Sequence, residues 1–258
     1  MTSEPILTLQ DIAYTYPGQA HPVLSDLHFE LASGQRIGLI GPNGRGKTTL
    51  LHLCMGLLQP GRGTILFKGK RVETRQQLQK LRQAIGLVFQ SPDDQLFCPT
   101  VLEDVAFGPL NQGLTVEQAR TLAREALDQV GLQGFEHRIT HKLSGGEKKL
   151  LSLATVLAMQ PEALLLDEPT TGLDPDTRHD LVSLLNRLEQ TLLIVSHDWD
   201  FLHKTTTRLI TLDNGRILHL DHAVLHQHVH VHPSGDVPHE HSTRNHINVP
   251  LEGGAPET

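Results

Sequence analysis

Cysteine and aromatic residues are scarce in this sequence. Two of its 258 residues are cysteines, and phenylalanine, tryptophan and tyrosine together make up 4%. Cys54 and Cys98 form no CxxC or Cys/His pattern, so the sequence indicates no disulfide framework and fits a reducing compartment. Because aromatic side chains are few, aliphatic side chains must supply most of the core.

The chain also lacks an excess of basic charge and a long apolar run. It has 22 Lys and Arg residues against 29 Asp and Glu residues, which gives a net charge of −7. This balance argues against nucleic acid as the main partner, since binding to phosphate backbones requires a basic surface. No apolar run approaches the ~18 residues of a membrane-spanning helix, and the N-terminus lacks the pattern of a signal peptide. We therefore expect a soluble protein that reaches a membrane only through a partner.

Strand-like and helix-like segments alternate along the chain up to about residue 220. Strand candidates lie at 6–16, 24–31, 36–40, 63–67, 85–89, 163–167, 191–195 and 208–212. Helical stretches lie at 46–58, 101–107, 116–130, 145–159 and 176–189. This alternation predicts an α/β fold with a largely parallel sheet that helices cover on both faces.

The segment from about residue 91 to 160 contains helical stretches without intervening strands, and we expect it to form a helical subdomain. Three helix starts in it have the spacing of a capping box, at Thr100/Glu103, Thr115/Gln118 and Ser144/Glu147. Residues 221–258 lose the apolar periodicity and are rich in histidine. The sequence predicts a domain of residues 1–220 followed by a poorly ordered, flexible tail.

A glycine-rich motif follows the predicted strand 36–40. It reads Gly41-x-x-x-x-Gly46-Lys47-Thr48 and precedes a predicted helix, which is the context of a phosphate-binding P-loop. Backbone N–H groups of such a loop surround phosphates, the lysine can reach the β- and γ-phosphates of ATP, and the threonine hydroxyl can ligate Mg²⁺. Arg45 stands where a small residue is commoner, but the position is variable and we expect function to survive.

Polar residues follow three other apolar strands. Asp167 ends one of them, where a carboxylate can hold Mg²⁺, and Glu168 is placed to polarise an attacking water. Asp-Glu-Pro can also simply end a strand. His197 is predicted to contact the γ-phosphate or Glu168, although a histidine at a strand end is more often packed or capped. The amide of Gln90 can approach both Mg²⁺ and the water.

A second glycine-rich motif opens a predicted helix about a hundred residues after the P-loop. Ser144, Gly145 and Gly146 would expose backbone N–H groups at the positive end of the helix dipole, which makes an anion site. One ATP does not need both glycine-rich sites on the same face of one chain. A head-to-tail pair of chains, in which each presents its second motif to the ATP of the other, uses both. The sequence therefore predicts an ATP-dependent dimer.

With these motifs the chain resembles the ATPase subunit of ABC (ATP-binding cassette) transporters over residues 5–218. The matching motifs are Walker A at 41–49, the Q-loop Gln90, the signature Leu143–Glu147, Walker B ending at Asp167, then Glu168, the D-loop 172–175 and the H-loop His197. The resemblance implies an α/β P-loop NTPase domain with a mostly parallel core sheet, an antiparallel N-terminal β subdomain and a helical subdomain.

The resemblance also implies which residues handle the nucleotide. The nucleotide-binding residues would be Tyr16, Gly41, Pro42, Asn43, Gly44, Arg45, Gly46, Lys47, Thr48, Thr49, Ser144, Gly145, Gly146 and Asp174. The catalytic residues would be Lys47, Gln90, Glu168 and His197, and Mg²⁺ would be held by Thr48, Gln90 and Asp167. Tyr16 would lie against adenine, while core packing is the competing interpretation for an aromatic residue in an N-terminal strand.

Within the ABC family, residues 88–97 and 157–162 look like energy-coupling-factor transporters, especially the cobalt and nickel importers. This resemblance implies transmembrane partner subunits that contact residues 91–107, a position at the cytoplasmic face of the membrane, and a dimer with itself or with a homologous ATPase. One departure is Lys149-Leu150-Leu151, where a more polar sequence is expected.

The C-terminal tail has histidines at alternate positions. His226, His228, His230 and His232 would share one face of an extended chain and could bind Ni²⁺, Co²⁺ or another transition metal. A tail without a role is the competing interpretation.

Three other functions remain open at this stage. They are import of a vitamin or another small molecule, a non-transport ABC ATPase, and metal storage on a cassette scaffold. A single cassette, the absence of a long coiled coil and the acidic charge argue against the second.

Overall fold

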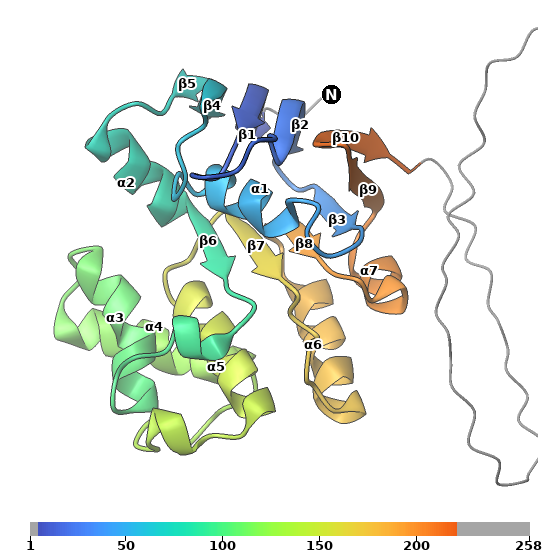
Figure 1. The fold of residues 1–258 in the computed structure, drawn as a ribbon. Helices are drawn as coiled ribbons and strands as arrows, with labels where there is room; N and C mark the ends of the chain where they lie inside the picture. The colour runs from blue at the N-terminus through green and yellow to red at the C-terminus, as the bar shows by residue number, and fades with distance from the viewer. Residues whose placement is uncertain (1–4, 221–258) are drawn as a thin grey trace, which may run out of the picture. The chain divides into compact units, whose positions relative to one another are not determined.

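The computed structural model describes residues 5–220 and contains two β-sheets and a set of helices (Figure 1). The strands are β1 Pro5–Tyr14, β2 Leu24–Ala32, β3 Arg36–Ile40, β4 Arg62–Phe67, β5 Lys70–Arg71, β6 Ile85–Val88, β7 Ala163–Asp167, β8 Thr191–Val195, β9 Arg208–Asp213 and β10 Arg216–His219. The α-helices are α1 Lys47–Cys54, α2 Arg75–Ala84, α3 Val101–Asn111, α4 Val116–Gln129, α5 Gly145–Leu157, α6 Pro175–Arg187 and α7 Trp199–Thr205. The predicted histidine tail lies outside the described residues.

The larger sheet has the strand order β10-β9-β3-β8-β7-β6. Its strands pair in parallel except at the edge, where β10 pairs antiparallel with β9. The central strands are runs of buried residues because both faces of the sheet are covered. A second sheet, β2-β1-β4-β5, is antiparallel. The predicted mostly parallel sheet and antiparallel N-terminal sheet are both confirmed.

Between β6 and β7 the chain forms helices α3, α4 and α5 (Figure 1). The three predicted capping boxes are present at the starts of these helices. In each, the cap side chain accepts a hydrogen bond from the backbone N–H three residues later, which satisfies a donor that the first helical turn leaves free. None of the α-helices among residues 5–220 is both long and apolar enough to cross a membrane.

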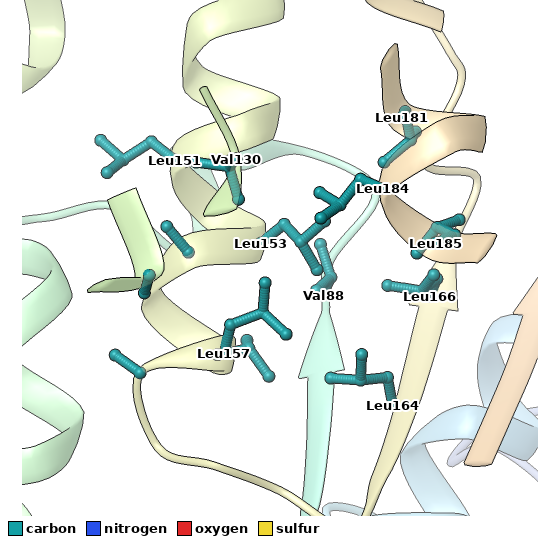
Figure 2. Packing of buried hydrophobic residues seen from close by; sticks show 14 of the residues in the cluster. Val88, Val130, Leu151, Leu153, Leu157, Leu164, Leu166, Leu181, Leu184 and Leu185 are labelled. Atoms are coloured by element: carbon teal, nitrogen blue, oxygen red, sulfur yellow. The ribbon is translucent and has the colours of Figure 1, made fainter. Parts of the chain in front are cut away.

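Two apolar clusters lie on opposite faces of the parallel sheet. In β7, Leu164 and Leu166 belong to one cluster and Ala163 and Leu165 to the other, as the alternation of side chains along a strand requires. Figure 2 shows the first cluster, where leucines of α5 and α6 meet Leu164 and Leu166. The second cluster joins α1 and the antiparallel sheet to the other face. The aliphatic core predicted from the scarcity of aromatic residues is confirmed.

Some elements differ from their predicted ranges or were not predicted. The helix after the P-loop was expected to reach residue 58, but α1 ends at Cys54. Gly56 adopts a left-handed conformation with φ +60°, and the N–H of Leu57 bonds back to the carbonyl of His52, which ends the helix. Helices α2 and α7 were missed. The residues of α2 are mostly polar and Leu81 is the one fully buried among them, so its two leucines, Leu78 and Leu81, were too weak a signal to reveal the helix.

A single arginine in β3 joins the sheet to the ends of two helices. The guanidinium of Arg36 donates to the carbonyls of Leu185 (2.6 Å) and Leu188 (3.1 Å) near the end of α6, and to that of Thr205 (2.9 Å) at the end of α7. The last carbonyls of a helix have no partner within it, and a cation there also suits the helix dipole. Arg36 therefore anchors α6 and α7 against the sheet.

Replacing Arg36 by methionine should lower the free energy of unfolding by about 2–4 kcal/mol, because three carbonyls lose a charged donor. Urea-induced unfolding of the ligand-free chain measures this change. The control is Arg187→Met at the exposed end of α6, which should change the free energy by less than about 0.5 kcal/mol. Equal effects of the two substitutions would contradict the anchoring role.

Candidate active site

The parallel strands end at one edge of the sheet, and the predicted site residues follow these ends. The P-loop follows β3, Gln90 follows β6, Asp167 ends β7 and His197 follows β8. They border a cavity of about 630 Å³. Its lining residues are Tyr16, Gln19, Val23, Asn43, Gly44, Gly46, Lys47, Thr48, Thr49, Gln90, Asp167, Glu168, Thr171 and His197. Residues distant in sequence thus form one site.

The P-loop wraps around the side chain of Lys47. Its ammonium donates to the carbonyls of Gly41 (2.6 Å) and Pro42 (3.0 Å), and burial lowers its pKa. Gly46, the residue before α1, has φ +93°, and a Cβ there would lie 2.8 Å from a methyl group of Val23. Only glycine fits this position, because both the backbone and the space exclude a side chain. The loop therefore presents N–H groups and a cation to the cavity.

Thr48 and Asp167 come from different motifs but lie in direct contact. The hydroxyl of Thr48 donates to Oδ2 of Asp167 at 2.8 Å. Burial raises the pKa of Asp167, while the bond from Thr48 opposes this change. A hydroxyl oxygen beside a carboxylate is a donor set that suits a hard divalent cation such as Mg²⁺. The residues present fit the ion that the sequence analysis expected.

Glu168 is buried at the floor of the cavity, with 5% of the residue exposed. Its Oε2 lies 2.8 Å from Nδ1 of His197 and accepts a bond from the backbone N–H of His197 at 3.3 Å. Its Oε1 is buried and has no hydrogen-bond partner within residues 5–220. An unpaired buried carboxylate oxygen is costly unless something else binds it. It can accept a proton from a water molecule in the cavity.

Tyr16 and Gln90 lie at the borders of the cavity. The hydroxyl of Tyr16 shares a hydrogen bond with that of Thr49 at 3.0 Å, and its ring meets that of Tyr14 edge to face at 5.0 Å. Tyr14 is buried, whereas Tyr16 is half-buried. Gln90 is exposed, and its carbonyl accepts a bond from the ammonium of Lys149.

Some predicted nucleotide-binding residues lie outside the cavity. Gly41, Pro42 and Arg45 belong to the P-loop but do not line it, and the motif Ser144–Gly146 begins α5 in the helical segment. Asp174 caps α6, where its carboxylate accepts bonds from the N–H groups of Asp176 and Thr177. The structure therefore does not join the two glycine-rich motifs around one cavity within the chain.

Sequence reasoning missed Gln19, Val23 and Thr171 in the cavity lining, and also the buried Lys149 near it. Gln19 and Val23 lie in the loop after β1, which has no motif, whereas Thr171 follows Glu168 closely enough to be suspected. The four tail histidines predicted to bind a metal lie outside the described residues. Within residues 5–220, no group of three or more histidine, cysteine or acidic side chains could hold a metal ion.

Asp167→Asn should raise the melting temperature of the ligand-free protein by about 2–4 °C, the change expected for about 1 kcal/mol in a domain of this size. The substitution removes a charge whose burial is unfavourable, as its raised pKa indicates, and an asparagine oxygen can still accept the bond from Thr48. Thermal unfolding measures the shift. In the control, Asp180→Asn on the exposed face of α6 should change the melting temperature by less than about 1 °C. A lower melting temperature of Asp167→Asn would contradict the interpretation.

Comparison with known proteins places this site in a family. The family model described as ABC transporter matches residues 24–171. A putative ABC transporter ATP-binding protein of Nitratidesulfovibrio vulgaris is 55% identical over 243 residues, which cover 94% of this chain and 89% of that protein. The energy-coupling factor transporter ATP-binding protein EcfA of Methanothermobacter thermautotrophicus is 43% identical over 217 residues, covering 83% and 70% of the two chains.

A solved structure has the same fold. CbiO1 of Clostridium perfringens, described as part of the ABC transporter complex cbiONQ, superposes with a TM-score of 0.75 at 35% identity and covers 84% of this chain and 88% of its own. The chain therefore belongs to the ABC transporter family, has the ABC ATPase fold, and is the ATP-binding, ATP-hydrolysing subunit of an ABC transporter.

Proposed function

We propose that this chain is the ATPase subunit of an energy-coupling-factor importer and powers uptake of nickel or cobalt through membrane partner subunits. The observation that carries the ATPase part is the buried Glu168, whose Oε1 is unpaired at the floor of the P-loop cavity while His197 holds Oε2. This arrangement supports hydrolysis because the carboxylate is held in place and keeps one oxygen without a competing hydrogen bond.

The P-loop residues are proposed to bind the phosphates of ATP. Lys47 would exchange its bonds to Gly41 and Pro42 for the β- and γ-phosphates, and Tyr16 would hold adenine at the far border of the cavity. Thr48 and Asp167 would hold Mg²⁺, with Gln90 nearby. A bound Mg²⁺ neutralises charge on the phosphates during transfer.

In hydrolysis, Glu168 is proposed to orient water and take its proton through Oε1. His197 lies against Oε2, and its exposed ring can also reach the γ-phosphate. Gln90 also lines the cavity, and its amide is proposed to orient the same water. Positioning of this kind contributes most of the catalysis in phosphoryl transfer.

A second chain is proposed to complete the site. A Cβ added to Gly145 would meet no atom of the described chain within 4 Å, and the φ of Gly145 is not in the left-handed region. The described chain thus gives no reason for glycine at this position, whereas a phosphate approaching the start of α5 from another chain does. This supports a head-to-tail dimer with itself or with a homologous ATPase.

An exposed apolar surface on the helical segment is proposed to contact the membrane partner. Phe97, Phe107 and Leu110 are exposed, and the rings of Phe97 and Phe107 meet edge to face at 4.8 Å. Grooves of about 500 and 370 Å³ lie on the two sides of Phe107. Exposed apolar patches of this kind mark interaction sites. The patch includes residues of the segment 91–107, and its occupation would place the subunit at the cytoplasmic face of the membrane.

The metal cargo rests on two sequence features. Residues 88–97 resemble those of cobalt and nickel importers, and His226, His228, His230 and His232 alternate in the tail. Imidazoles suit Ni²⁺ and Co²⁺, and the tail would buffer or sense the cargo. Import of a vitamin or another small molecule is the second candidate, favoured by the similarity to energy-coupling-factor ATPases in general.

Glu168→Gln should still bind ATP and form a trapped dimer, while turnover falls by about 100-fold or more, because the amide cannot take a proton. Phosphate release measures turnover, and light scattering with and without ATP measures the dimer. The matched control is Glu162→Gln, an exposed residue paired with Lys68, which should keep turnover within about two-fold of the native value. Rapid hydrolysis by Glu168→Gln would refute the proposed role.

Cells that express the native subunit with its membrane partners should accumulate Ni²⁺ or Co²⁺, and cells with Glu168→Gln should not, since transport requires hydrolysis. Elemental analysis of washed cells identifies the metal. A third strain, in which the four alternating tail histidines are replaced by glutamine, distinguishes the identity of the cargo from the role of the tail. In this strain metal uptake should persist, but its dependence on the metal concentration in the medium should change. Equal accumulation with the native and Glu168→Gln subunits would reject the metal cargo and favour the small-molecule alternative.

A further inference from the structure

Helix α5 buries a lysine beside the active site. Lys149 lies five residues after Ser144, which at the rise of an α-helix is about 7.5 Å along the axis. Only 8% of the residue is exposed. Lysine is almost never buried at this level without partners that hold its charge.

The partners of Lys149 are two backbone carbonyls of the active site. Its ammonium donates to the carbonyl of Gln90, after β6, and to that of Glu168, after β7, at 3.2 Å. Burial lowers the pKa of Lys149, while the carboxylates of Asp167 and Glu168 oppose this change. One cation therefore joins α5 to both loops and lies near the two buried carboxylates.

Other side chains attach α5 to the Gln90 loop, but within residues 5–220 they make no hydrogen bond to Glu168. Gln95 accepts a bond from the N–H of Phe89 at 3.1 Å and donates to the carbonyl of Ser152 at 2.7 Å. Lys148 forms an ion pair with Asp93 at 2.7 Å. These contacts hold the loop on the helix. Among the hydrogen bonds of the described chain, the bond from Lys149 is the one that links α5 to Glu168.

The backbone of Glu168 needs such support. Its φ is +45°, a left-handed conformation that is strained for a residue with a side chain. Its N–H bonds to the carbonyl of Val195 at 2.9 Å, and its carbonyl accepts from Lys149 and from the N–H of Thr171. A rotation of this peptide would turn the carboxylate away from His197. The bond from Lys149 opposes that rotation.

We propose that Lys149 is a positioning residue for hydrolysis: it holds the backbone of Glu168 and the Gln90 loop on α5, so that the carboxylate is aimed while α5 is docked. Ser144–Gly146, the motif proposed to contact the ATP of the second chain, lies at the start of α5. Lys149 therefore connects this motif to Glu168, the proposed base of its own chain's site. The inference rests on the proposed role of Glu168 as the base.

The first test compares Lys149→Met, Lys149→Gln and the native full-length chain in steady-state ATP hydrolysis. Methionine keeps the length of the side chain without a donor, and glutamine keeps an N–H donor without the charge. The kcat should fall about ten-fold or more in Lys149→Met and less in Lys149→Gln, with KM for ATP within about three-fold of the native value. The control, Lys80→Met at an exposed position of α2, should stay within about two-fold. Unchanged kcat in both Lys149 variants would overturn the proposal.

The second test separates positioning from loss of structure. In single-turnover measurements, adding Lys149→Met to Glu168→Gln should lower the residual rate by less than about two-fold, because the group that Lys149 positions is already absent. A further ten-fold loss in the double variant would show that Lys149 acts elsewhere and would overturn the proposal. If Lys149→Met does not fold, as judged by thermal unfolding, the same comparison with Lys149→Gln decides.

The two tests also separate this inference from the assignment of Glu168. Native turnover in Glu168→Gln alone would reject Glu168 as the base and the positioning role with it. Loss of turnover in Glu168→Gln, together with native kcat in both Lys149 variants, would reject the positioning role alone.

Discussion

The parallel alignment of β3, β6, β7 and β8 brings the P-loop, Gln90, Asp167 with Glu168, and His197 to one edge of the sheet. The buried aliphatic residues of these strands fix the register. Ile194 of β8 lies beside Gly38 of β3 on one side and beside Leu166 of β7 on the other. Because the strands run in one direction, the chain leaves the sheet four times at the same edge. The P-loop, Gln90, Asp167 with Glu168, and His197 follow these exits. Apolar packing thereby assembles a polar site.

The site combines buried carboxylate and ammonium groups, each of which would be unfavourable if it were buried without the others. Asp167 and Glu168 are buried carboxylates, and the buried lysines Lys47 and Lys149 both interact electrostatically with them. Thr48 and His197 each bond to one carboxylate. The one buried side-chain nitrogen or oxygen without a hydrogen-bond partner in residues 5–220 is Oε1 of Glu168, the carboxylate proposed to take a proton from water. Partial satisfaction of a buried polar network is costly, and here it coincides with the reactive atom.

The sequence predicted the central strands well. The bounds of β3, β7 and β8 agree with the predicted ranges, since each is a short apolar run that turns abruptly polar. Helix α2 was missed because its residues are mostly polar, although Thr74 and Gln77 form a capping box that could have revealed it. Motif spacing also located the P-loop and the residues after β6, β7 and β8.

What the sequence could not predict depends on contacts between distant segments. The acceptors of Lys149 are backbone carbonyls, which every residue type carries, so the sequence does not indicate them. The sequence showed only that Lys149-Leu150-Leu151 is an unusual run after the signature motif. Asp174 was assigned to the nucleotide from its motif, while in the structure its carboxylate caps α6. For Lys149 the tertiary partners were unknown, whereas the contacts of Asp174 with Asp176 and Thr177 are local and were overlooked.

The central claim is that each chain holds half of two ATP sites. The structure of the Glu168→Gln chain bound to ATP and Mg²⁺ tests it most directly. The account predicts that Ser144–Gly146 of a second chain lie within about 3 Å, a hydrogen-bond distance, of the phosphates held by the P-loop. Phosphates closed off by residues of their own chain, with Ser144–Gly146 facing solvent, would contradict it.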